Sequence, residues 1–553
     1  MDMRFDVVVI GGGGAALRAA YSAWQNGAKT AILCKKEASR SGATYYSVAE
    51  VGAFNVPDGS MDPTDSPEAF YRDMEEASLR MARLPLCRLL AERAEDALKD
   101  LEEIGAGSVF SKKDGKYNVY QACFSTKPRS HVIENHFKPI LKALGTAVAK
   151  TDVTVLNDMQ AVDLLTSGGE IGGVLAQDAA GEPVMIRAKS VILACGGASR
   201  LFRRNMYPAD ITGDGYAMAY RAGAQLSNME FIQAGIGVAH PFINLFGNYL
   251  WKAFPTIRNA RGEDILLKYG GSPQAVHEAE AQKTHFPFSS RDASRLIEIA
   301  VQKEIIQGNG TERGNVYLDF LHTDFDKLLR EAPDFASMWR FTYDWHKEKG
   351  IDLYREPIEI SCFAHAINGG VLIDEYAESS VPGLYAAGEV ASGPHGADRL
   401  GGNMSVTCQV FGKIAGVSAA QRAKGMASFP DVERSFRELN SRRAAKVTGV
   451  QQDLAALTEQ LQDASDKALL IVRDEAGLKG YLETLDVLRQ ETARGCTAEN
   501  LGALLQLENL IASGEMIASA ALERRESRGS HYRADYPEMD DAYGSPIILQ
   551  HIP

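Results

Sequence analysis

The stretch FDVVVIGGGGAALRAAYSAWQNG, which runs from Phe5 to Gly27, decides the fold of this chain. Val7 to Ile10 form a continuous apolar run, which is typical of a buried parallel strand. A glycine turn follows, and apolar residues at helical spacing from Leu17 to Trp24 predict a helix. The next apolar run, AKTAILCKK, predicts a second strand. The stretch therefore predicts the strand–turn–helix–strand unit of a doubly wound α/β domain.

The glycine turn matches the GxGxxG/A pattern of dinucleotide-binding folds, with Gly11, Gly13 and Ala16 at the three small positions. The first position allows a tight turn, the second lets the backbone approach a pyrophosphate, and the third lets helix and strand pack closely. The helix start then offers free N–H groups and a positive dipole end to phosphates. We therefore expect Gly14 and Ala15 to contact the nucleotide as well. Glu37 is near the place where an acidic residue would bind the ribose of NAD, but Lys35 and Lys36 come before it, so NAD is not the obvious ligand.

Two later segments repeat the form of a buried strand that ends in a glycine turn. AKSVILACGGASRLF ends its strand at Gly196, and VPGLYAAGEVASG ends its strand at Gly388 and Glu389. These segments lie far apart in the sequence, yet we expect their glycine turns to meet at the same crevice of the sheet. The chain therefore predicts a nucleotide-binding domain that is interrupted by a large insertion.

Bulk composition limits the classes of partner. The chain has 553 residues and a net charge of −13, which predicts more than one domain and argues against nucleic acid or an anionic membrane as the main partner. The 7 cysteines form no CxxC pair, so we expect no metal site or iron–sulfur cluster within the chain. No apolar run is long enough to span a membrane, and the start of the chain lacks the pattern of a signal peptide. We expect a cytoplasmic protein with no membrane span of its own, which would reach a membrane only through a partner.

Several motifs, in order along the chain, carry a resemblance to a known family. Together with the N-terminal glycine turn, they resemble the flavoprotein subunits of succinate dehydrogenase and fumarate reductase, and L-aspartate oxidase. The motifs are TGDGYAMAYRAGAQLSNMEFIQ (212–233), HAINGG (365–370), VPGLYAAGEV (381–390), HGADRLGGNMS (395–405) and RRESRGSHYRADYPEMDD (524–541).

The resemblance implies FAD as the cofactor and a fold of class α/β. It implies a Rossmann-like FAD-binding domain with an inserted α+β capping domain and a C-terminal helical domain. We place the FAD-binding domain at residues 1–229 plus 355–430, the capping domain at 230–354, and the C-terminal helical domain and tail at 431–553.

The same resemblance implies hydride transfer between flavin N5 and a carbon next to a carboxylated carbon. His365 resembles the histidine that hydrogen-bonds the substrate carboxylate, and Arg399 the arginine that clamps it. Arg291 resembles the capping-domain arginine that passes a proton to the substrate. Without the family pattern, His365 is typical of a buried core histidine, and Arg291 of a surface arginine paired with Asp292. The predicted cofactor contacts are Gly11, Gly13, Gly14, Ala15, Ala16, Lys35, Ser41, Ala43, Thr44, Gly196, Asp214, Glu389 and Ser405.

The chain departs from the family pattern after its second strand. Membrane-bound members carry Ser-His-Thr there, and the histidine binds FAD covalently, whereas this chain has Gly42 and Ala43 in that place. We therefore predict noncovalent FAD. A second departure lies in MEFIQAGIGVAHPFINLFG, where Gly235 and Ile236 replace the His-Pro that helps to hold a second substrate carboxylate. Whether His240 replaces the missing histidine is left open.

If it does not, the substrate is a monocarboxylate, or a carboxylate with a bulkier or apolar far end, because a buried carboxylate without partners is costly. Lys252 and Arg258 are available near this stretch but no acid is, so no proton relay is assigned. Aromatic residues that either line such a space or belong to the core are Tyr45, Tyr46, Phe242, Phe246 and Trp251.

The leading hypothesis is an FAD-dependent oxidoreductase that reduces or oxidises the α,β carbon pair of a small carboxylate. One alternative is an amino-acid oxidase similar to L-aspartate oxidase. Another is an electron-transfer subunit that docks a separate iron–sulfur partner. The polar C-terminal residues Glu526, Arg528, His531 and Arg533 permit such docking.

Overall fold

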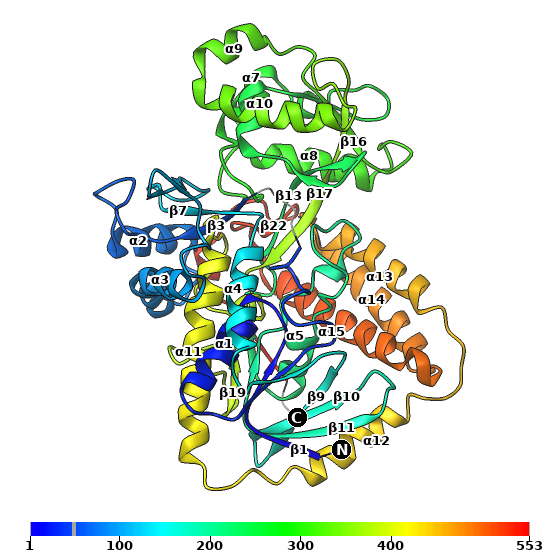
Figure 1. Ribbon diagram of the computed structural model, residues 1–553. Coiled ribbons are helices and arrows are strands. Elements are labelled where there is room, and N and C mark those ends of the chain that lie inside the picture. The colour runs from blue at the N-terminus through cyan, green and yellow to red at the C-terminus, as the bar shows by residue number, and fades with distance from the viewer. Residues whose placement is uncertain (1, 47–50, 552–553) are drawn as a thin grey trace.

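The central sheet is built around the N-terminal strand (Figure 1). The structure, a computed structural model, describes residues 2–46 and 51–551. Strand β1 (Asp2–Ile10) runs parallel to β2 (Thr30–Leu33) and to β11 (Pro183–Leu193), and β19 (Leu384–Ala386) runs parallel to β11. The strands that end in the predicted glycine turns therefore lie side by side. The sheet is completed by β8 (Thr154–Leu156), β9 (Gln160–Ser167) and β10 (Glu170–Gln177).

Two helices with small residues at their contact cover one face of this sheet. Helix α1 (Gly14–Gln25) follows the first glycine turn, and α11 (Asn403–Gly425) packs along it. A Cβ added at Gly416 would lie 2.3 Å from the carbonyl oxygen of Ala19, so the backbones are in direct contact. This close packing fixes the start of α11 beside the glycine turn, and both helix starts face one site.

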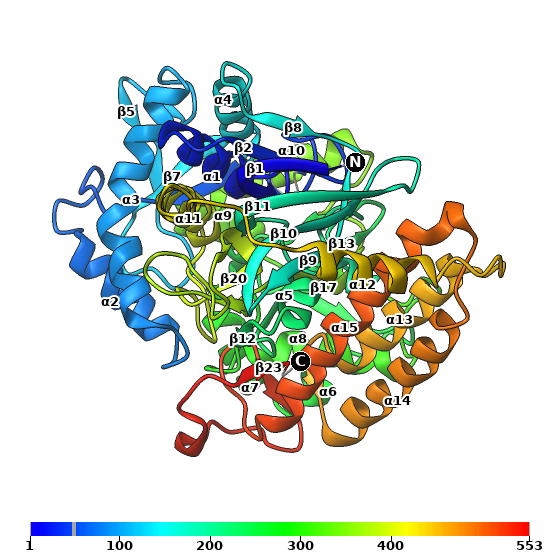
Figure 2. The ribbon, with the colours of Figure 1, turned by 90° about the horizontal axis from the view of Figure 1, so that it is seen from below.

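A peripheral layer lies beside α11, on the side away from the C-terminal helices (Figure 2). It contains the buried Arg129, whose guanidinium pairs with Asp65 at 2.7 Å and also with Asp73. Its elements are β3 (Val51–Asn55), α2 (Pro67–Ala77), α3 (Leu84–Ile104), β4 (Lys112–Lys113), β5 (Lys116–Tyr117), β6 (Val119–Tyr120), β7 (Ser130–Glu134) and α4 (Lys138–Val148).

The predicted insertion stands above the sheet on a long antiparallel ribbon (Figure 1). Strand β13 (Ile232–His240) pairs with β17 (Ile358–Ile367) from Ile232 opposite Ile367 to His240 opposite Glu359. The ribbon crosses the predicted boundary between the capping range and the FAD-binding range, so it joins the two parts. The insertion also contains β14 (Asn244–Leu245), β15 (Thr256–Arg258), α6 (Ile265–Gly270), α7 (Pro273–Gln282), α8 (Arg295–Ile306), β16 (Val316–Asp319), α9 (Phe325–Glu331) and α10 (Pro333–Glu348).

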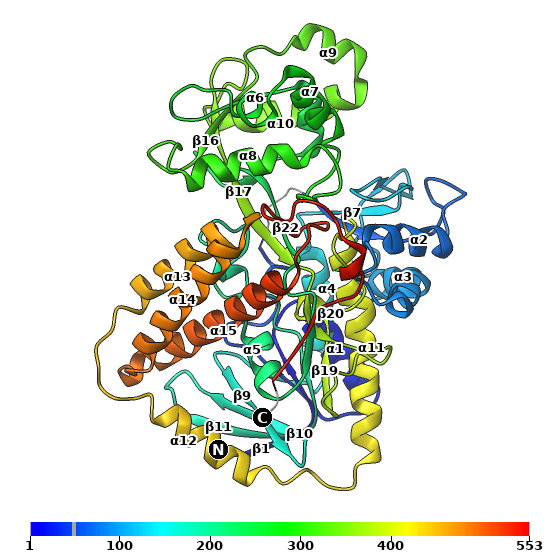
Figure 3. The same cartoon turned by 180° about the vertical axis from the view of Figure 1, so that it is seen from behind.

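The C-terminal part is helical, as predicted, but only part of it forms a bundle. Helices α13 (Leu454–Ala468), α14 (Glu475–Thr492) and α15 (Leu501–Glu523) pack together, and α15 also contacts α5 (Asp214–Arg221). Helix α12 (Glu433–Ala444) lies instead against β9 and β10. Figure 3 shows the final segment, in red, crossing the back of the molecule.

The tail is docked as a strand. Strand β23 (Ile548–Gln550) pairs with β12 (Gln225–Ser227) in a small sheet with β18 (Gly370–Leu372) and β20 (Ala391–Ser392). A further short pair joins β21 (Val472–Arg473) to β22 (Tyr532–Arg533). Within residues 2–46 and 51–551, no helix has the length and apolar character needed to cross a membrane. The fold class is confirmed as α/β with an FAD-binding part and a C-terminal part.

Candidate active site

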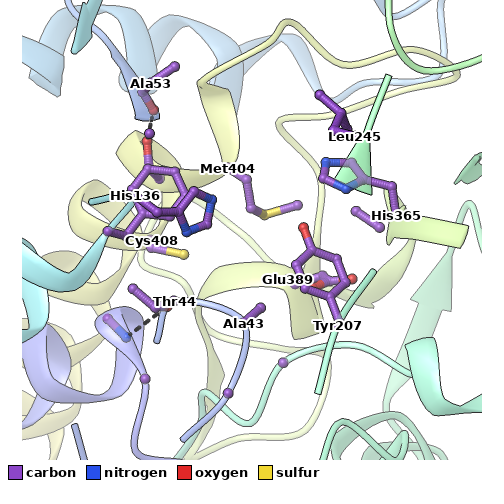
Figure 4. Close-up of a pocket in the computed structure, with 18 of the residues that line it drawn as sticks. Ala43, Thr44, Ala53, His136, Tyr207, Leu245, His365, Glu389, Met404 and Cys408 are labelled. Atoms are coloured by element: carbon purple, nitrogen blue, oxygen red, sulfur yellow. Dashed lines mark hydrogen bonds between the residues drawn. The ribbon is translucent and has the colours of Figure 1, made fainter. Parts of the chain in front are cut away.

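A cavity of about 1140 Å³ extends from the N-terminal glycine turn to the inserted region. Its wall includes the turn after β1, the ends of β11 and β19, the start of α11 and one side of α10. Figure 4 shows its middle part, with His136, Cys408 and Thr44 on one side, His365, Leu245 and Tyr207 on the other, and Met404 between them. The predicted nucleotide end and the predicted substrate end therefore belong to one continuous space.

Most of the predicted site residues lie on this wall, and two do not. Ala16 is fully buried in the first turn of α1, because its small side chain packs into the core and does not point into the cavity. Arg291 also lies off the wall. The predicted residues on the wall are Gly11, Gly13, Gly14, Ala15, Lys35, Ser41, Ala43, Thr44, Gly196, Asp214, Glu389 and Ser405, together with His365 and Arg399.

The glycine turn fits the pyrophosphate of a dinucleotide. Gly11 has a φ of +129°, and a Cβ there would lie 2.2 Å from the carbonyl oxygen of Ala194. A side chain at this position is therefore excluded by backbone strain and by contact with β11. Helix α1 has no side-chain cap and no acidic residue in its first turn. Its positive end is thus available to an anion, which is the arrangement that binds phosphate in such folds.

Lys35 and Asp214 form an ion pair at the nucleotide end of the cavity. Lys35 Nζ lies 2.8 Å from Asp214 Oδ2 and donates to Thr212 Oγ1 at 2.5 Å. The amide of Asn509 donates to the other carboxylate oxygen at 2.9 Å. Burial raises the pKa of Asp214, but Lys35 and these hydrogen bonds outweigh it and leave the pKa below its usual value. Asp214 is thus ionised, and it links the cavity to helix α15.

Glu389 follows β19 and is buried in the cavity wall. Burial raises its pKa to about 7, although the Ile367 N–H donates to it at 3.1 Å. A side chain at Gly197 would collide with this carboxyl group, because a Cβ there would lie 2.4 Å from Glu389 Oε1. A carboxyl group that is half protonated near neutral pH can donate or accept a hydrogen bond, which suits contact with the hydroxyls of a bound nucleotide.

His365 lies on β17 between two aromatic rings. Tyr207 stacks on it with ring centroids 5.3 Å apart, and Phe286 meets it edge-on at 5.4 Å. Burial, with the neighbouring Arg399 and His136, lowers the pKa of His365 to about 3, so the ring is neutral at neutral pH. Its Nδ1 has no hydrogen-bond partner among the described residues. A core histidine is normally satisfied, so this atom indicates a group that is open to a ligand.

Arg399 is a second group on the wall that lacks a partner, here a carboxylate for its charge, in the described part of the chain. Its Nε donates to Gln233 Oε1 at 2.8 Å and its Nη1 to the Leu400 carbonyl at 3.0 Å. Burial lowers its pKa, and no carboxylate lies within ion-pair distance of it in the described part of the chain. An unpaired buried cation is costly. An anionic ligand would supply the missing partner, and His365 and Arg399 both line the same cavity.

Arg291 is held behind the cavity wall by Asp398. Its Nε and Nη2 donate to Asp398 Oδ2 at 3.0 and 2.7 Å, and Nη2 also donates to the Ala77 carbonyl at 3.1 Å. Its guanidinium lies 4.7 Å from the ring centroid of Phe124. The alternative pairing with Asp292 does not form. Arg291 therefore binds the residue that directly precedes Arg399 in the chain, and its proton role stays a prediction.

His395, near Asp398, gives a prediction about pH. Burial and then Arg399 lower its pKa from 6.5 to about 3, and both ring nitrogens lack partners in the described part of the chain. Between those values the unfolded state binds a proton at His395 that the folded state does not, so this residue makes stability fall as pH falls below 6.5, by about 1.4 kcal/mol per pH unit. We expect His395→Leu to flatten this part of the curve. Urea unfolding at several pH values measures it, and parallel curves for both proteins would contradict the assignment.

The two departures from the family pattern have structural outcomes. His240 ends β13 and does not reach the cavity wall. The structure therefore gives no support to His240 as a replacement for the missing histidine. Gly235 lies under the ring of Phe286. Of the aromatic residues proposed to line the space, Phe246 does so. Those that do not are Tyr45, Tyr46, Phe242 and Trp251.

The polar residues near the C-terminus are buried and bind one another. Arg528 Nε donates to Glu526 Oε1 at 2.7 Å, and both side chains are inaccessible. His531 Nδ1 lies 2.7 Å from Arg473 Nη1, and Arg533 binds Asp535. These residues hold the last segment onto the body of the molecule. Because they are buried, these four side chains do not themselves offer an exposed surface to a partner.

Sequence reasoning missed several residues on the wall, including Tyr207, His136, Asp210 and Cys408. Tyr207 lies in the loop before α5, and His136 lies after β7 with a left-handed φ of +59°. Neither residue belongs to a motif, and each reaches the site only because distant segments pack together. No signal in the sequence marks them.

Comparisons with known proteins agree with this geometry. A family described as "FAD binding domain" matches residues 6–405, and one described as "Fumarate reductase flavoprotein C-term" matches 458–545. The chain is 31% identical to a subunit of the "Fumarate reductase (CoM/CoB)" of Methanothermobacter marburgensis, over 98% of this chain and 96% of that protein. It is 29% identical to "L-aspartate oxidase" of Pseudomonas aeruginosa, over 97% and 96%.

Among solved structures, Mycobacterium smegmatis Sdh1 in complex with UQ1 superposes with a TM-score of 0.85 at 26% identity, covering 99% of this chain and 94% of that one. The cofactor of the matched family is FAD, and the cavity described above fits it. The chain belongs to the fumarate reductase and succinate dehydrogenase flavoprotein family, whose members include L-aspartate oxidase, and it is an FAD-dependent oxidoreductase.

Proposed function

We propose that this oxidoreductase acts on the α,β carbon pair of a small carboxylate, held by Arg399 and His365. The observation that carries the proposal is a buried arginine without a carboxylate partner in the described residues, on the same wall as the unsatisfied His365. Such a pair suits one carboxylate, because a guanidinium and a ring N–H both donate to carboxylate oxygens.

The residues at the other end of the cavity would hold FAD. The turn from Gly11 to Ala15 would bind the pyrophosphate, and Glu389 would supply a carboxyl group for nucleotide hydroxyls. When bound, FAD supplies the redox chemistry, giving or taking a hydride. Arg399 and His365 bind the carboxylate and stabilise the enolate-like charge that builds on it as the neighbouring carbons change bonding. The aromatic rings of Tyr207 and Phe286 contact His365 and orient it.

Product analysis tests the proposal. Purified holoenzyme with a chemical reductant and an unsaturated carboxylate should yield the saturated acid, which NMR identifies. A chain that reduces none of a broad set of unsaturated carboxylates, and oxidises none of their saturated counterparts, would contradict the proposal.

We also propose that FAD is bound without a covalent link. Gly42 and Ala43 line the cavity where membrane-bound relatives carry a histidine, and neither residue has a side chain that can form a bond to a flavin ring. Acid precipitation of the holoenzyme is therefore expected to release essentially all of the flavin into the supernatant. Absorbance of the supernatant and of the washed pellet measures this. Flavin that stays with the denatured chain would contradict the prediction.

Amino-acid oxidation of the L-aspartate type is less well supported by the site. Aspartate carries two carboxylates, and the described wall offers Arg399 as its one cation without a carboxylate partner. Reduction of the oxidised flavin by L-aspartate, in a test parallel to that above, would favour this alternative.

A further inference from the structure

Phe286 occupies the space that a side chain at position 235 would need. A Cβ added to Gly235 would lie 2.3 Å from Cε2 of Phe286 and 3.0 Å from its Cζ. Gly235 is in β13, and Phe286 is in the loop between α7 and α8. The ring and the glycine are thus complementary, and a histidine at position 235 would require the ring to move.

The Phe286 ring is presented to the carboxylate-binding end of the cavity. It lines the wall and meets His365 edge-on, with an interplanar angle of 74°. Its backbone N–H donates to Cys123 Sγ at 3.2 Å, which fixes the loop at this point. A ligand held by His365 and Arg399 therefore has an aromatic ring beside it where relatives of the fumarate reductase type place a polar group.

Among the described residues, the cavity wall offers one cation that can pair with a substrate carboxylate. Lys35 is paired with Asp214 at 2.8 Å, at the nucleotide end. His346 is buried, its Nδ1 lies 2.7 Å from the Thr342 carbonyl, and burial lowers its pKa. Arg291 is off the wall and paired with Asp398. In the described part of the chain, Arg399 is thus the wall's one cation free of a carboxylate, so a second carboxylate would have no cationic partner there.

The wall formed by α10 and by the segment after β13 carries mostly apolar and aromatic side chains, with the polar Asn244, Asn248 and Thr342 among them. Helix α10 contributes some of them, and the segment after β13 contributes others. The large apolar residues on this part of the wall are Val238, Phe246, Leu250, Phe320, Phe341 and Trp345. Such a wall favours a ligand group of matching size and low polarity.

We propose that the substrate is an α,β-unsaturated monocarboxylate whose far end is an apolar group of the size of an aryl ring, and that the Gly235–Phe286 pair sets this specificity. The inference rests on the proposed function for its carboxylate end. In the reaction, the carbon–carbon double bond becomes a single bond, taking a hydride from reduced FAD and a proton that solvent replenishes, while FAD returns to its oxidised form.

Binding of two matched, unreactive acids tests the specificity separately from turnover. Phenylacetate and malonate differ only in whether a phenyl ring or a second carboxylate is attached to the same CH₂ group, and neither has a carbon pair that can be dehydrogenated. Titration of the oxidised holoenzyme, followed by the flavin difference spectrum, gives both dissociation constants. We expect phenylacetate to bind at least about tenfold more tightly than malonate.

Variants sharpen the test. Phe286→Ala is expected to weaken phenylacetate about tenfold, and Phe286→Leu to weaken it less, because leucine keeps an apolar contact. Gly235→His combined with Phe286→Ala is expected to reverse the preference in favour of malonate. Phe254→Leu is the matched control, since Phe254 is 42% exposed, stacks on His277 and is off the wall.

The outcomes separate the two proposals. Malonate binding as tightly as phenylacetate would overturn the substrate class, even if fumarate proved to be reduced. Preference for phenylacetate without reduction of cinnamate or any other unsaturated acid would support the substrate class for binding and overturn the proposed reaction. Preference for phenylacetate with rapid reduction of cinnamate is the expected result.

Discussion

Replacing Arg291 with alanine is expected to lower turnover by about 10²- to 10⁴-fold while FAD remains bound, which is the range for loss of a general acid. The family resemblance gives Arg291 the role of passing a proton to the substrate. In the structure it stands behind the wall, with Nη2 2.7 Å from Asp398 Oδ2 and its guanidinium over Phe124. A proton role therefore requires the loop from α7 to α8 to shift its arginine toward the cavity. Steady-state turnover, with flavin content measured on the same sample, gives the result.

A second variant separates the proton role from charge balance. Alanine at position 291 leaves the fully buried Asp398 without its cation, and such a stranded charge costs about 3–5 kcal/mol of stability. The double variant Arg291→Ala/Asp398→Asn removes the stranded charge. If Arg291 handles the proton, the double variant stays as slow as the single one. Turnover near that of the wild type in the double variant would show that Arg291 only neutralises Asp398.

Arg399→Gln is expected to lower kcat/KM by about 10²- to 10³-fold, equivalent to about 3–4 kcal/mol, as for loss of one preorganised donor to a developing charge. Glutamine keeps an amide beside Gln233 but removes the cation. Because the proposed contact strengthens as charge builds on the carboxylate, kcat should fall as well as affinity.

The matched control for Arg399 is Arg340→Gln, which makes the same change on an exposed arginine. Arg340 lies on α10, pairs with Asp344 at 3.7 Å and is not on the cavity wall. It should keep the kinetics of the wild type. An Arg399→Gln enzyme with an unchanged kcat/KM would remove Arg399 from the proposed site.

The nucleotide end of the site was predictable from the sequence because its chemistry is local. A turn that brings the backbone to a pyrophosphate needs glycine at fixed spacing, and Gly11 shows why, with a left-handed φ and a carbonyl where its Cβ would be. Each of the two later strands is also followed directly in the sequence by its glycine turn. The fold class followed from the same pattern, since buried parallel strands that alternate with helices admit few arrangements.

The substrate end was only partly predictable, because its contacts join distant segments. The partner of Arg291 is Asp398, 107 residues away, and not the adjacent Asp292, which instead lies 3.3 Å from His285. The loss of a histidine at Gly235 was visible in the sequence. That a phenylalanine from another loop fills the space was not, because no periodicity or motif links the two positions.

Reoxidation of the reduced flavin tests the central claim most directly. The holoenzyme is reduced without oxygen, and flavin absorbance is followed after addition of fumarate, acrylate, cinnamate or cinnamyl alcohol, which has the double bond of cinnamate but no carboxylate. The account predicts rapid reoxidation by at least one unsaturated carboxylate, none by the alcohol, and loss of the reaction in Arg399→Gln. Failure of every carboxylate, or equal rates with cinnamate and the alcohol, would contradict it.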